Sequence, residues 1–260
     1  MSNNDDDIAK HLANIPDIDP PSCISARSIQ AEIEKLPLFS DKLPISSIVD
    51  ENIQDELYHR KMKQLQAKFS YIRQVRRDGN CFYRAFAFRF FERFKSDHKK
   101  LTDLKAKAGK YKEKLIDLKY PEISVCDFHD TFVEFIDQVI KNGKLDLMNT
   151  LGDKDTSLCD YIVVVFRLYI SVYLQEHSEF FQAFLTGDKT LKQFCSDEVE
   201  PMSTEADHLQ VLALTSALEV PIEVVYLDRS VGDLNIHKTD ENSDSDIKLL
   251  YRPSHYDILY

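Results

Sequence analysis

The heptapeptide DGNCFYR, Asp78–Arg84, decides how the chain folds. It follows Tyr71–Val75, a segment typical of a short strand. It opens the aromatic segment Phe82–Phe94, which contains no glycine or proline and is typical of a buried helix. Gly79 permits the tight turn between the two, and the acidic and amide side chains beside it are types that turns and helix N-caps prefer. The stretch therefore predicts a strand, a tight turn and a core helix.

Cys81 falls on the first turn of that predicted helix. Unpaired backbone N–H groups and the helix dipole at this position favour a thiolate over a thiol, so we expect the pKa of Cys81 to be lowered. This is the placement of a nucleophilic cysteine. The alternative is a buried structural cysteine, the commoner state of a cysteine in a protein core. A nucleophile also needs a base and a group that orients the base.

Composition restricts the class of protein. The chain has 260 residues, of which 43% are hydrophobic and 30% charged, values typical of one globular catalytic domain with extensions. Its five cysteines are widely spaced, with no C-x-x-C and no zinc-finger spacing, so we expect no disulfide framework and no metal. The acidic N-terminus is unlike a signal peptide, and we expect a cytoplasmic protein, with the nucleus open as a second compartment.

Charge and hydropathy bear on the partners. The formal net charge of −11 argues against non-specific binding to nucleic acid, which requires a basic face. Eight lysines lie on Leu101–Tyr120 or just before it, and on an acidic chain they favour a solvated helix face over a nucleic-acid or membrane surface. The longest purely apolar run, Tyr161–Phe166, is far shorter than the ~20 residues that span a bilayer. We therefore expect neither nucleic acid nor a membrane as a partner.

The chain divides into three parts. Residues 1–24 are acidic and interrupted by prolines, which predicts a disordered tail. Residues 25–50 form an N-terminal arm, with helical spacing over Ser25–Leu36 followed by a loop between two prolines, Pro37 and Pro44. The arm helix is either docked permanently on the body or ordered only by a partner, and both interpretations stay open. The remainder, 51–260, is the predicted catalytic domain.

The catalytic domain is predicted to be a helical body packed on a small sheet, an α/β (α+β) fold. The sheet is expected from Pro221–Leu227, Ile247–Tyr251 and His255–Tyr260, with Tyr71–Val75 joining it and Arg229–Asp246 as a polar loop. Apolar residues at helical spacing predict helices over Asn52–Phe69, Leu101–Tyr120, Phe128–Ile140 (capped by Asp127), Asp155–His177, Ser178–Leu185, Thr190–Cys195 and Glu205–Leu218.

His255 is the histidine best placed to act as a base. The others lie in the tail, in charged surroundings, near helix ends or in the polar loop. On a strand, His255 and Asp257 at positions i and i+2 point to the same face. A carboxylate beside an imidazole accepts its N–H, fixes its tautomer and favours the imidazolium. The pair predicts a Cys81–His255–Asp257 triad; the alternative is an ordinary polar strand face.

Two motifs carry a resemblance to a known family. The stretch D-G-N-C-F-Y-R-A from Asp78 and the ending L-Y-R-P-x-H-Y-D-I-L-Y over Leu250–Tyr260 closely resemble the otubains. Otubains are cysteine-protease deubiquitinases of the ovarian-tumour (OTU) class. Asp160–Val164 and Glu198–Met202 are also similar. The arm is similar to that of the longer, otubain 1 type.

The resemblance implies a papain-like OTU fold that needs no cofactor. Cys81 would be the nucleophile, His255 the general base and acid, and Asp257 the orienting carboxylate. Asp78 would lie in the loop whose backbone N–H groups form the oxyanion hole. The implied reaction is hydrolysis of the isopeptide bond between the C-terminal glycine of ubiquitin and a lysine amine, through a thioester. Arg77 departs from the family, which usually has proline at this position.

The resemblance also implies partners. Ubiquitin and polyubiquitin are the implied substrates, with a preference for chains linked through ubiquitin's lysine forty-eight, and the N-terminal arm would contact the lysine-donating ubiquitin. Ubiquitin-conjugating enzymes are the implied further partners. The alternative function is a non-catalytic inhibitor that holds ubiquitin and a conjugating enzyme and blocks chain synthesis. The arm matches the family only loosely.

Overall fold

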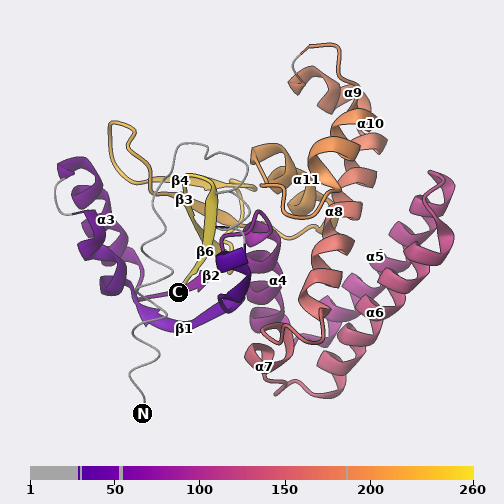
Figure 1. Cartoon of the computed structure of the whole chain (residues 1–260), viewed down its shortest axis with the longest axis horizontal. Helices are drawn as coiled ribbons and strands as arrows, with labels where there is room; N and C mark the ends of the chain where they lie inside the picture. The colour runs from indigo at the N-terminus through magenta and orange to yellow at the C-terminus, as the bar shows by residue number, and fades with distance from the viewer. Residues whose placement is uncertain (1–28, 30, 53–54, 186) are drawn as a thin grey trace.

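A computed structural model describes residues 29, 31–52, 55–185 and 187–260. The tail expected over 1–24 lies outside the described residues, as does most of the first half of the arm. Residues 31–35 are helical, in agreement with the helical spacing there. The body has three layers: one helix on one face of a sheet, the sheet itself, and a larger group of helices on the other face (Figure 1).

The sheet has six strands in the order β1-β2-β6-β5-β3-β4. Its neighbours are antiparallel except for β3 and β5, which run parallel. The last strand of the chain therefore lies in the interior of the sheet, between β2 and β5. The strands are β1 (Phe39–Pro44), β2 (Tyr71–Val75), β3 (Glu223–Tyr226), β4 (Asn235–Lys238), β5 (Lys248–Arg252) and β6 (His255–Leu259).

The helices are distributed unequally over the two faces of the sheet. α3 and η1 cover one face through a small apolar cluster, and the remaining helices belong to the main core on the other face (Figure 1). They are η1 (Ile45–Asn52), α3 (Glu56–Lys68), α4 (Cys81–Phe94), α5 (His98–Asp117), α6 (Glu122–Lys141), α7 (Leu147–Leu151), α8 (Leu158–Glu176), α9 (Ser178–Phe181), η2 (Gln182–Phe184), α10 (Leu191–Phe194), the π-helix η3 (Cys195–Val199) and α11 (His208–Leu218).

Helix α4 is the centre of the main core, as its aromatic composition predicts. The Phe82 ring packs against Tyr256 of β6 with ring centroids 5.3 Å apart. One turn later, Phe86 meets Phe166 of α8 edge-on at 5.6 Å. Burying each of these side chains contributes roughly 1.5–3 kcal/mol to folding. The helix is therefore fixed between sheet and α8, and its first residue, Cys81, is fixed with it.

Two strands were missed and one helix start was wrong by six residues, while other predicted helix ends differ from the structure by up to four residues. The loop expected between Pro37 and Pro44 is strand β1, which pairs with β2 and ends at Pro44, where a missing N–H is tolerated at a sheet edge. The polar loop Arg229–Asp246 contains edge strand β4, which pairs with β3. Helix α6 begins at Glu122, directly after Pro121, and not at Phe128; Asp127 is inside the helix.

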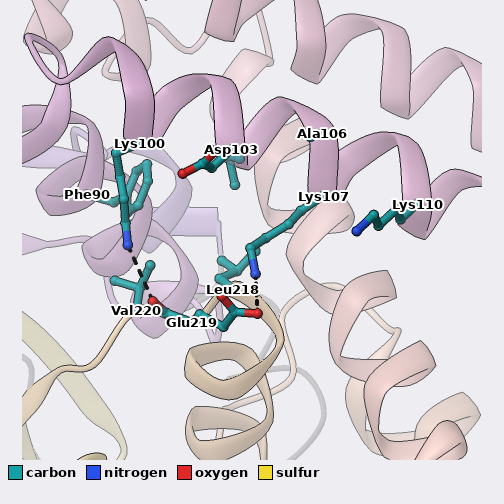
Figure 2. Close-up of a pocket in the computed structure, with 10 residues that line it drawn as sticks. Phe90, Lys100, Asp103, Ala106, Lys107, Lys110, Leu218, Glu219 and Val220 are labelled. Carbon is teal, nitrogen blue, oxygen red and sulfur yellow. Dashed lines mark hydrogen bonds and ion pairs between the residues drawn. The ribbon is translucent and has the colours of Figure 1, made fainter.

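The lysine-rich helix α5 is held by ion pairs to neighbouring elements. Lys105 lies 2.7 Å from Asp137 of α6, and Lys114 lies 2.8 Å from Glu176 of α8. At the end of α11, Lys107 pairs with the Glu219 carboxylate at 2.7 Å and Lys100 donates to the Glu219 carbonyl at 3.4 Å (Figure 2). The pocket drawn in Figure 2 lies between α5 and the end of α11. The lysines that line it cap the C-terminus of α11, because cations there interact favourably with the last carbonyls of a helix.

Helix α8 is the described helix whose length and mean hydropathy of 1.5 would suit a membrane span. It is 61% buried over the apolar window and packs against α4, α6 and α11. A helix that crosses the core of a globular domain has the same composition. Its burial here accounts for its hydropathy.

Candidate active site

Three segments converge at the N-terminus of α4. Cys81 is the first residue of the helix and is 3% exposed. β6 brings His255 and Asp257 to the same end of the sheet. The segment between η3 and α11 closes the site from the other side. A hollow at this meeting point is lined by Cys81, Glu205, Ala206, Asp207, Tyr251, Ser254 and Tyr256.

The turn before Cys81 requires glycine. Gly79 has φ of 75°, in the left-handed region, and a Cβ there would overlap the backbone carbonyl of Ser203. Asn80, the N-cap residue, makes no capping bond; its Oδ1 accepts from the Ser203 N–H at 2.9 Å and from Arg167 at 2.8 Å. The turn is therefore fastened to the segment that forms the opposite wall of the hollow.

His255 and Asp257 are joined as strand alternation predicts. His255 Nε2 lies 2.8 Å from Asp257 Oδ1. The same carboxylate accepts the Val75 N–H at 2.9 Å and a bond from Arg252 at 2.8 Å. Burial alone would raise the pKa of Asp257, but the imidazole and the Arg252 guanidinium outweigh burial and hold that pKa below its usual range. Asp257 is thus ionised and can only accept a hydrogen bond, so Nε2 of His255 carries the proton and donates it to the carboxylate.

The second ring nitrogen of His255 is available. Nδ1 is buried and has no hydrogen-bond partner among the described residues. Because Nε2 donates to Asp257, Nδ1 of the neutral ring carries the lone pair. Burial lowers the pKa of His255, and Asp257 only partly offsets this, while Arg77 and Arg252 lower it further. A buried imidazole with one nitrogen oriented and the other unpaired is suited to accept a proton.

The pKa expected for Cys81 was wrong in direction. Burial raises the pKa of the thiol to about 12, the Tyr256 backbone N–H lowers it, and the carboxylates of Asp78 and Asp257 raise it again. The position at the helix N-terminus is as predicted, but the loss of water around the sulfur outweighs the helix dipole. At neutral pH the raised pKa favours the neutral thiol of Cys81, and the lowered pKa of His255 favours the neutral imidazole.

Asp78 stabilises the turn through its carboxylate. It is paired with Arg84 of α4 and with Arg76 at 2.9 Å, and its Oδ1 accepts the Asn80 N–H at 3.1 Å. Burial would raise its pKa, but Arg84 holds that pKa below its usual range. Arg84 also bonds Asp160 of α8 at 2.7 Å. An ionised carboxylate with two arginine partners orders the loop and is unsuited to proton transfer.

Two arginines of the site were not singled out from the sequence. Arg252 fastens Asp257, and Arg167 of α8 binds the Gly79–Asn80 turn. The signal for Arg167 was a charged residue inside the most apolar segment of the chain. Among the described residues no group of three or more His, Cys, Asp and Glu side chains could hold a metal ion.

Comparison with known proteins identifies the family. The family model described as Peptidase C65 Otubain matches residues 31–260. The chain belongs to the otubain family. The otubain resemblance of its two motifs is thereby confirmed, and the chain is a cysteine peptidase of the deubiquitinating type.

The named relatives of this otubain support the same family assignment. It is 46% identical to ubiquitin thioesterase OTUB1 of Homo sapiens over 236 residues, 89% of this chain and 86% of the relative. Identity is 34% with ubiquitin thioesterase OTUB2 of Homo sapiens, over 86% of this chain and 95% of the relative. The OVARIAN TUMOR DOMAIN-containing deubiquitinating enzyme 1 of Arabidopsis thaliana is 36% identical over 89% of this chain and 83% of its own length.

Solved structures confirm the OTU fold of this otubain. A complex of h/ceOTUB1 with ubiquitin aldehyde and UBCH5B~Ub superposes with a TM-score of 0.84 at 30% identity, covering 91% of this chain and 96% of the other. A complex of ceOTUB1 with ubiquitin aldehyde and UBC13~Ub gives the same TM-score, covering 90% and 98%. The predicted helical body on a small sheet is therefore confirmed.

Proposed function

We propose that this otubain hydrolyses isopeptide bonds of polyubiquitin with Cys81 as nucleophile, His255 as general base and acid, and Asp257 as the orienting carboxylate. The observation that carries the proposal is the His255 ring: Nε2 is bonded to an ionised carboxylate and Nδ1 is buried and unpartnered. The ring belongs to the strand that borders the Cys81 hollow. Family membership supports the same chemistry.

The first half-reaction forms a thioester. The thiol proton moves to His255 Nδ1 as Cys81 Sγ attacks the carbonyl carbon of the C-terminal glycine of ubiquitin. The tetrahedral oxyanion is stabilised by backbone N–H groups of the Asp78–Cys81 loop. The imidazolium then gives its proton to the lysine nitrogen, the C–N bond breaks and the amine leaves.

The second half-reaction releases ubiquitin. Water gives a proton to His255 Nδ1 and its oxygen attacks the thioester carbon. The C–S bond then breaks and the imidazolium returns the proton to the sulfur, which restores the thiol and leaves a carboxyl group on ubiquitin. Asp257 stays ionised throughout and stabilises the imidazolium in both halves.

The raised pKa of Cys81 shapes this mechanism. A thiol whose pKa lies near 12 does not ionise alone at neutral pH, so its proton must leave in concert with attack, toward a base already held in place. The neutral Nδ1 of His255 supplies that base. The hollow beside Cys81 is walled by Tyr251 and Tyr256, which suits a glycine tail without side chains.

We further propose that the preferred substrate is linked through ubiquitin's lysine forty-eight and that the N-terminal arm contacts the lysine-donating ubiquitin. The helical part of the arm, residues 31–35, lies near the catalytic loop. Lys154 donates to the Lys35 carbonyl at 2.7 Å. Arg76, which also bonds Asp78, donates to the Glu34 carbonyl at 3.3 Å. A second ubiquitin bound by the arm would thus present its lysine close to Cys81.

A second function is favoured by a separate observation. The solved OTUB1 complexes contain UBC13~Ub or UBCH5B~Ub together with ubiquitin aldehyde. We therefore propose that this otubain also binds charged ubiquitin-conjugating enzymes and blocks chain synthesis without proteolysis. A substitution of Cys81 distinguishes the two functions, because hydrolysis needs the sulfur of Cys81 and inhibition of chain synthesis does not.

The test is a panel of di-ubiquitins, one for each linkage, incubated with the wild type and with Cys81→Ser. Rapid cleavage of the lysine-forty-eight dimer by the wild type alone supports hydrolysis; equal cleavage by both proteins rejects the role of Cys81. In a chain-synthesis assay with a charged conjugating enzyme, Cys81→Ser should still inhibit. Loss of inhibition in that variant rejects the non-catalytic function.

A further inference from the structure

Arg167 is a buried cation that no carboxylate in the described part of the chain neutralises. It lies in α8, it is 0% exposed, and none of the described acidic residues forms an ion pair with it. The other buried arginines of the site differ, because Arg76 and Arg84 pair with Asp78 and Arg252 pairs with Asp257. Burying an arginine without a counter-charge is costly, and an apolar side chain of similar volume would fill the space at lower cost. Packing alone therefore does not explain Arg167.

The acceptors of Arg167 belong to the two segments that lead into opposite walls of the catalytic hollow, one before Cys81 and one before Glu205. On the side of the catalytic turn, it donates to the Gly79 carbonyl at 3.1 Å and to Asn80 Oδ1 at 2.8 Å. On the other side, it donates to the Val199 carbonyl at 2.8 Å and to the Thr204 carbonyl at 2.7 Å. A fifth, longer bond runs from Arg167 to the Tyr83 hydroxyl at 3.4 Å. All five acceptors are neutral, so the guanidinium joins the two segments without a carboxylate that would cancel its charge.

These bonds fix the peptide groups that lead into Cys81. With the Gly79 carbonyl held by Arg167, the N–H on the opposite side of that peptide points away, where it donates to Asp78 Oδ1 at 3.1 Å. The orientation of the following peptide, which carries the Cys81 N–H, depends on this arrangement. The guanidinium thus determines how the catalytic turn presents its backbone donors.

The charge of Arg167 also acts on the sulfur. The guanidinium lies 4.1 Å from the centroid of the Tyr83 ring on α4. Burial lowers the pKa of Arg167, and a negative charge on Cys81 partly offsets that lowering, as expected for two opposite charges that attract each other. Among the charged groups around them, Asp78 and Asp257 act on Cys81, whereas Asp78 and Arg84 act on Arg167. Since both carboxylates oppose the thiolate, an uncompensated cation in this low-dielectric region favours it.

We propose that Arg167 is a positioning residue for the catalytic turn. Its guanidinium joins the Gly79–Asn80 turn to the Val199–Thr204 segment, and its positive charge, which no carboxylate of the described residues neutralises, stabilises negative charge at Cys81. This inference rests on the proposed function only in taking Cys81 as the nucleophile. The charge role and the positioning role make different demands on the side chain. A lysine at this position keeps the positive charge, but it lacks the planar guanidinium whose several N–H donors hold the two segments together.

The test compares Arg167→Gln, Arg167→Lys and the control Ser171→Ala in the full-length protein. Ser171 is buried one turn later on the same helix and bonds Glu200, so its loss perturbs the same packing without touching the turn. Three quantities are measured: the rate at which a small neutral electrophile alkylates Cys81 at fixed pH, located by peptide mapping; kcat and KM on a ubiquitin substrate; and Tm. Alkylation needs no ubiquitin, so a failure here is distinguishable from failure of the proposed function.

We expect Arg167→Gln to lower the alkylation rate about tenfold, which corresponds to a rise of about one unit in the pKa of Cys81. It should lower kcat by about 10²-fold with little change in KM. Arg167→Lys should lower kcat about tenfold but keep the alkylation rate within about twofold of the wild type, since the charge remains. Should Arg167→Gln fail to fold, Arg167→Lys still carries the test. Unchanged kcat in Arg167→Lys, slowed alkylation in that variant, or the same kinetic losses in Ser171→Ala would each overturn the inference.

Discussion

His255 Nε2 lies 2.8 Å from Asp257 Oδ1, two residues further along the same strand, and the opposite ring nitrogen of His255 has no hydrogen-bond partner among the described residues. The carboxylate is itself fixed by the Val75 N–H and by Arg252. The orientation of the imidazole is therefore determined by a strand, its neighbour β2 and a buried ion pair. The folded chain itself therefore orients the ring.

The first prediction concerns this carboxylate. Asp257→Asn should lower kcat by about 10²–10⁴-fold, because a neutral amide does not stabilise the imidazolium and its N–H, when turned to Nε2, selects the wrong tautomer. The matched control is Asp246→Asn, which removes a carboxylate from an exposed ion pair with Arg93. Steady-state kinetics on a ubiquitin substrate decides the matter: equal activity of the two variants would contradict the role of Asp257.

The second prediction concerns pH. Burial lowers the pKa of His255 below its ordinary value of ~6.5, and activity requires the neutral ring. The value of kcat/KM should therefore rise with pH through a pKa below ~6.5 and be constant from there to pH 8. Cys81, whose pKa is raised to about 12, should react slowly with small alkylating reagents at pH 7 in the absence of ubiquitin. Rapid alkylation of Cys81 at pH 6 would contradict this account.

The third prediction concerns the catalytic turn. Gly79→Ala forces a side chain onto a positive φ and against the Ser203 carbonyl, and should destabilise the fold by about 1–3 kcal/mol and lower kcat. Gly109→Ala is the control: nothing lies within 4 Å of the added methyl group on helix α5, and alanine there should stabilise by about 0.5–1 kcal/mol. Denaturant unfolding measures both. If Gly79→Ala is as stable and active as the wild type, the turn is not constrained in this way.

The fourth prediction concerns the arm. Lys154→Met removes the bonds to the Glu34 and Lys35 carbonyls and should loosen residues 31–35. Cleavage of lysine-forty-eight di-ubiquitin should fall several-fold, whereas a substrate with one ubiquitin and a small leaving group should be cleaved as before. Lys144→Met, at another exposed lysine, is the control. An equal loss on both substrates would show that Lys154 acts on the catalytic site and not through the arm.

The parts of the molecule that could be predicted from the sequence are those whose structure depends on residues close together in the chain. The turn at Gly79, the buried aromatic helix after it and the alignment of His255 with Asp257 follow from φ preference, composition and strand alternation. Cys81→Ser and Asp257→Asn test the proposed roles of the nucleophile and of the orienting carboxylate, and the pH profile tests that of His255. The geometry of these residues is compatible with those roles.

The parts that could not be predicted depend on tertiary neighbours. Strands β1 and β4 are edge strands, paired on one side only, so their sequences lack the apolar alternation of a buried strand. The raised pKa of Cys81 arises from burial and from two carboxylates that the fold brings together. Arg167 gave no signal beyond its polarity, since its acceptors lie in distant segments of the chain.

The most direct measurement is covalent capture of the nucleophile. Ubiquitin carrying an electrophile in place of its C-terminal carboxylate is incubated with the wild type and with Cys81→Ser, and the adduct is located by peptide mapping. We predict one adduct per chain on Cys81 in the wild type, and none in Cys81→Ser. An adduct on any of the other four cysteines (Cys23, Cys126, Cys159, Cys195), or one that persists in Cys81→Ser, would contradict the central claim that Cys81 is the nucleophile.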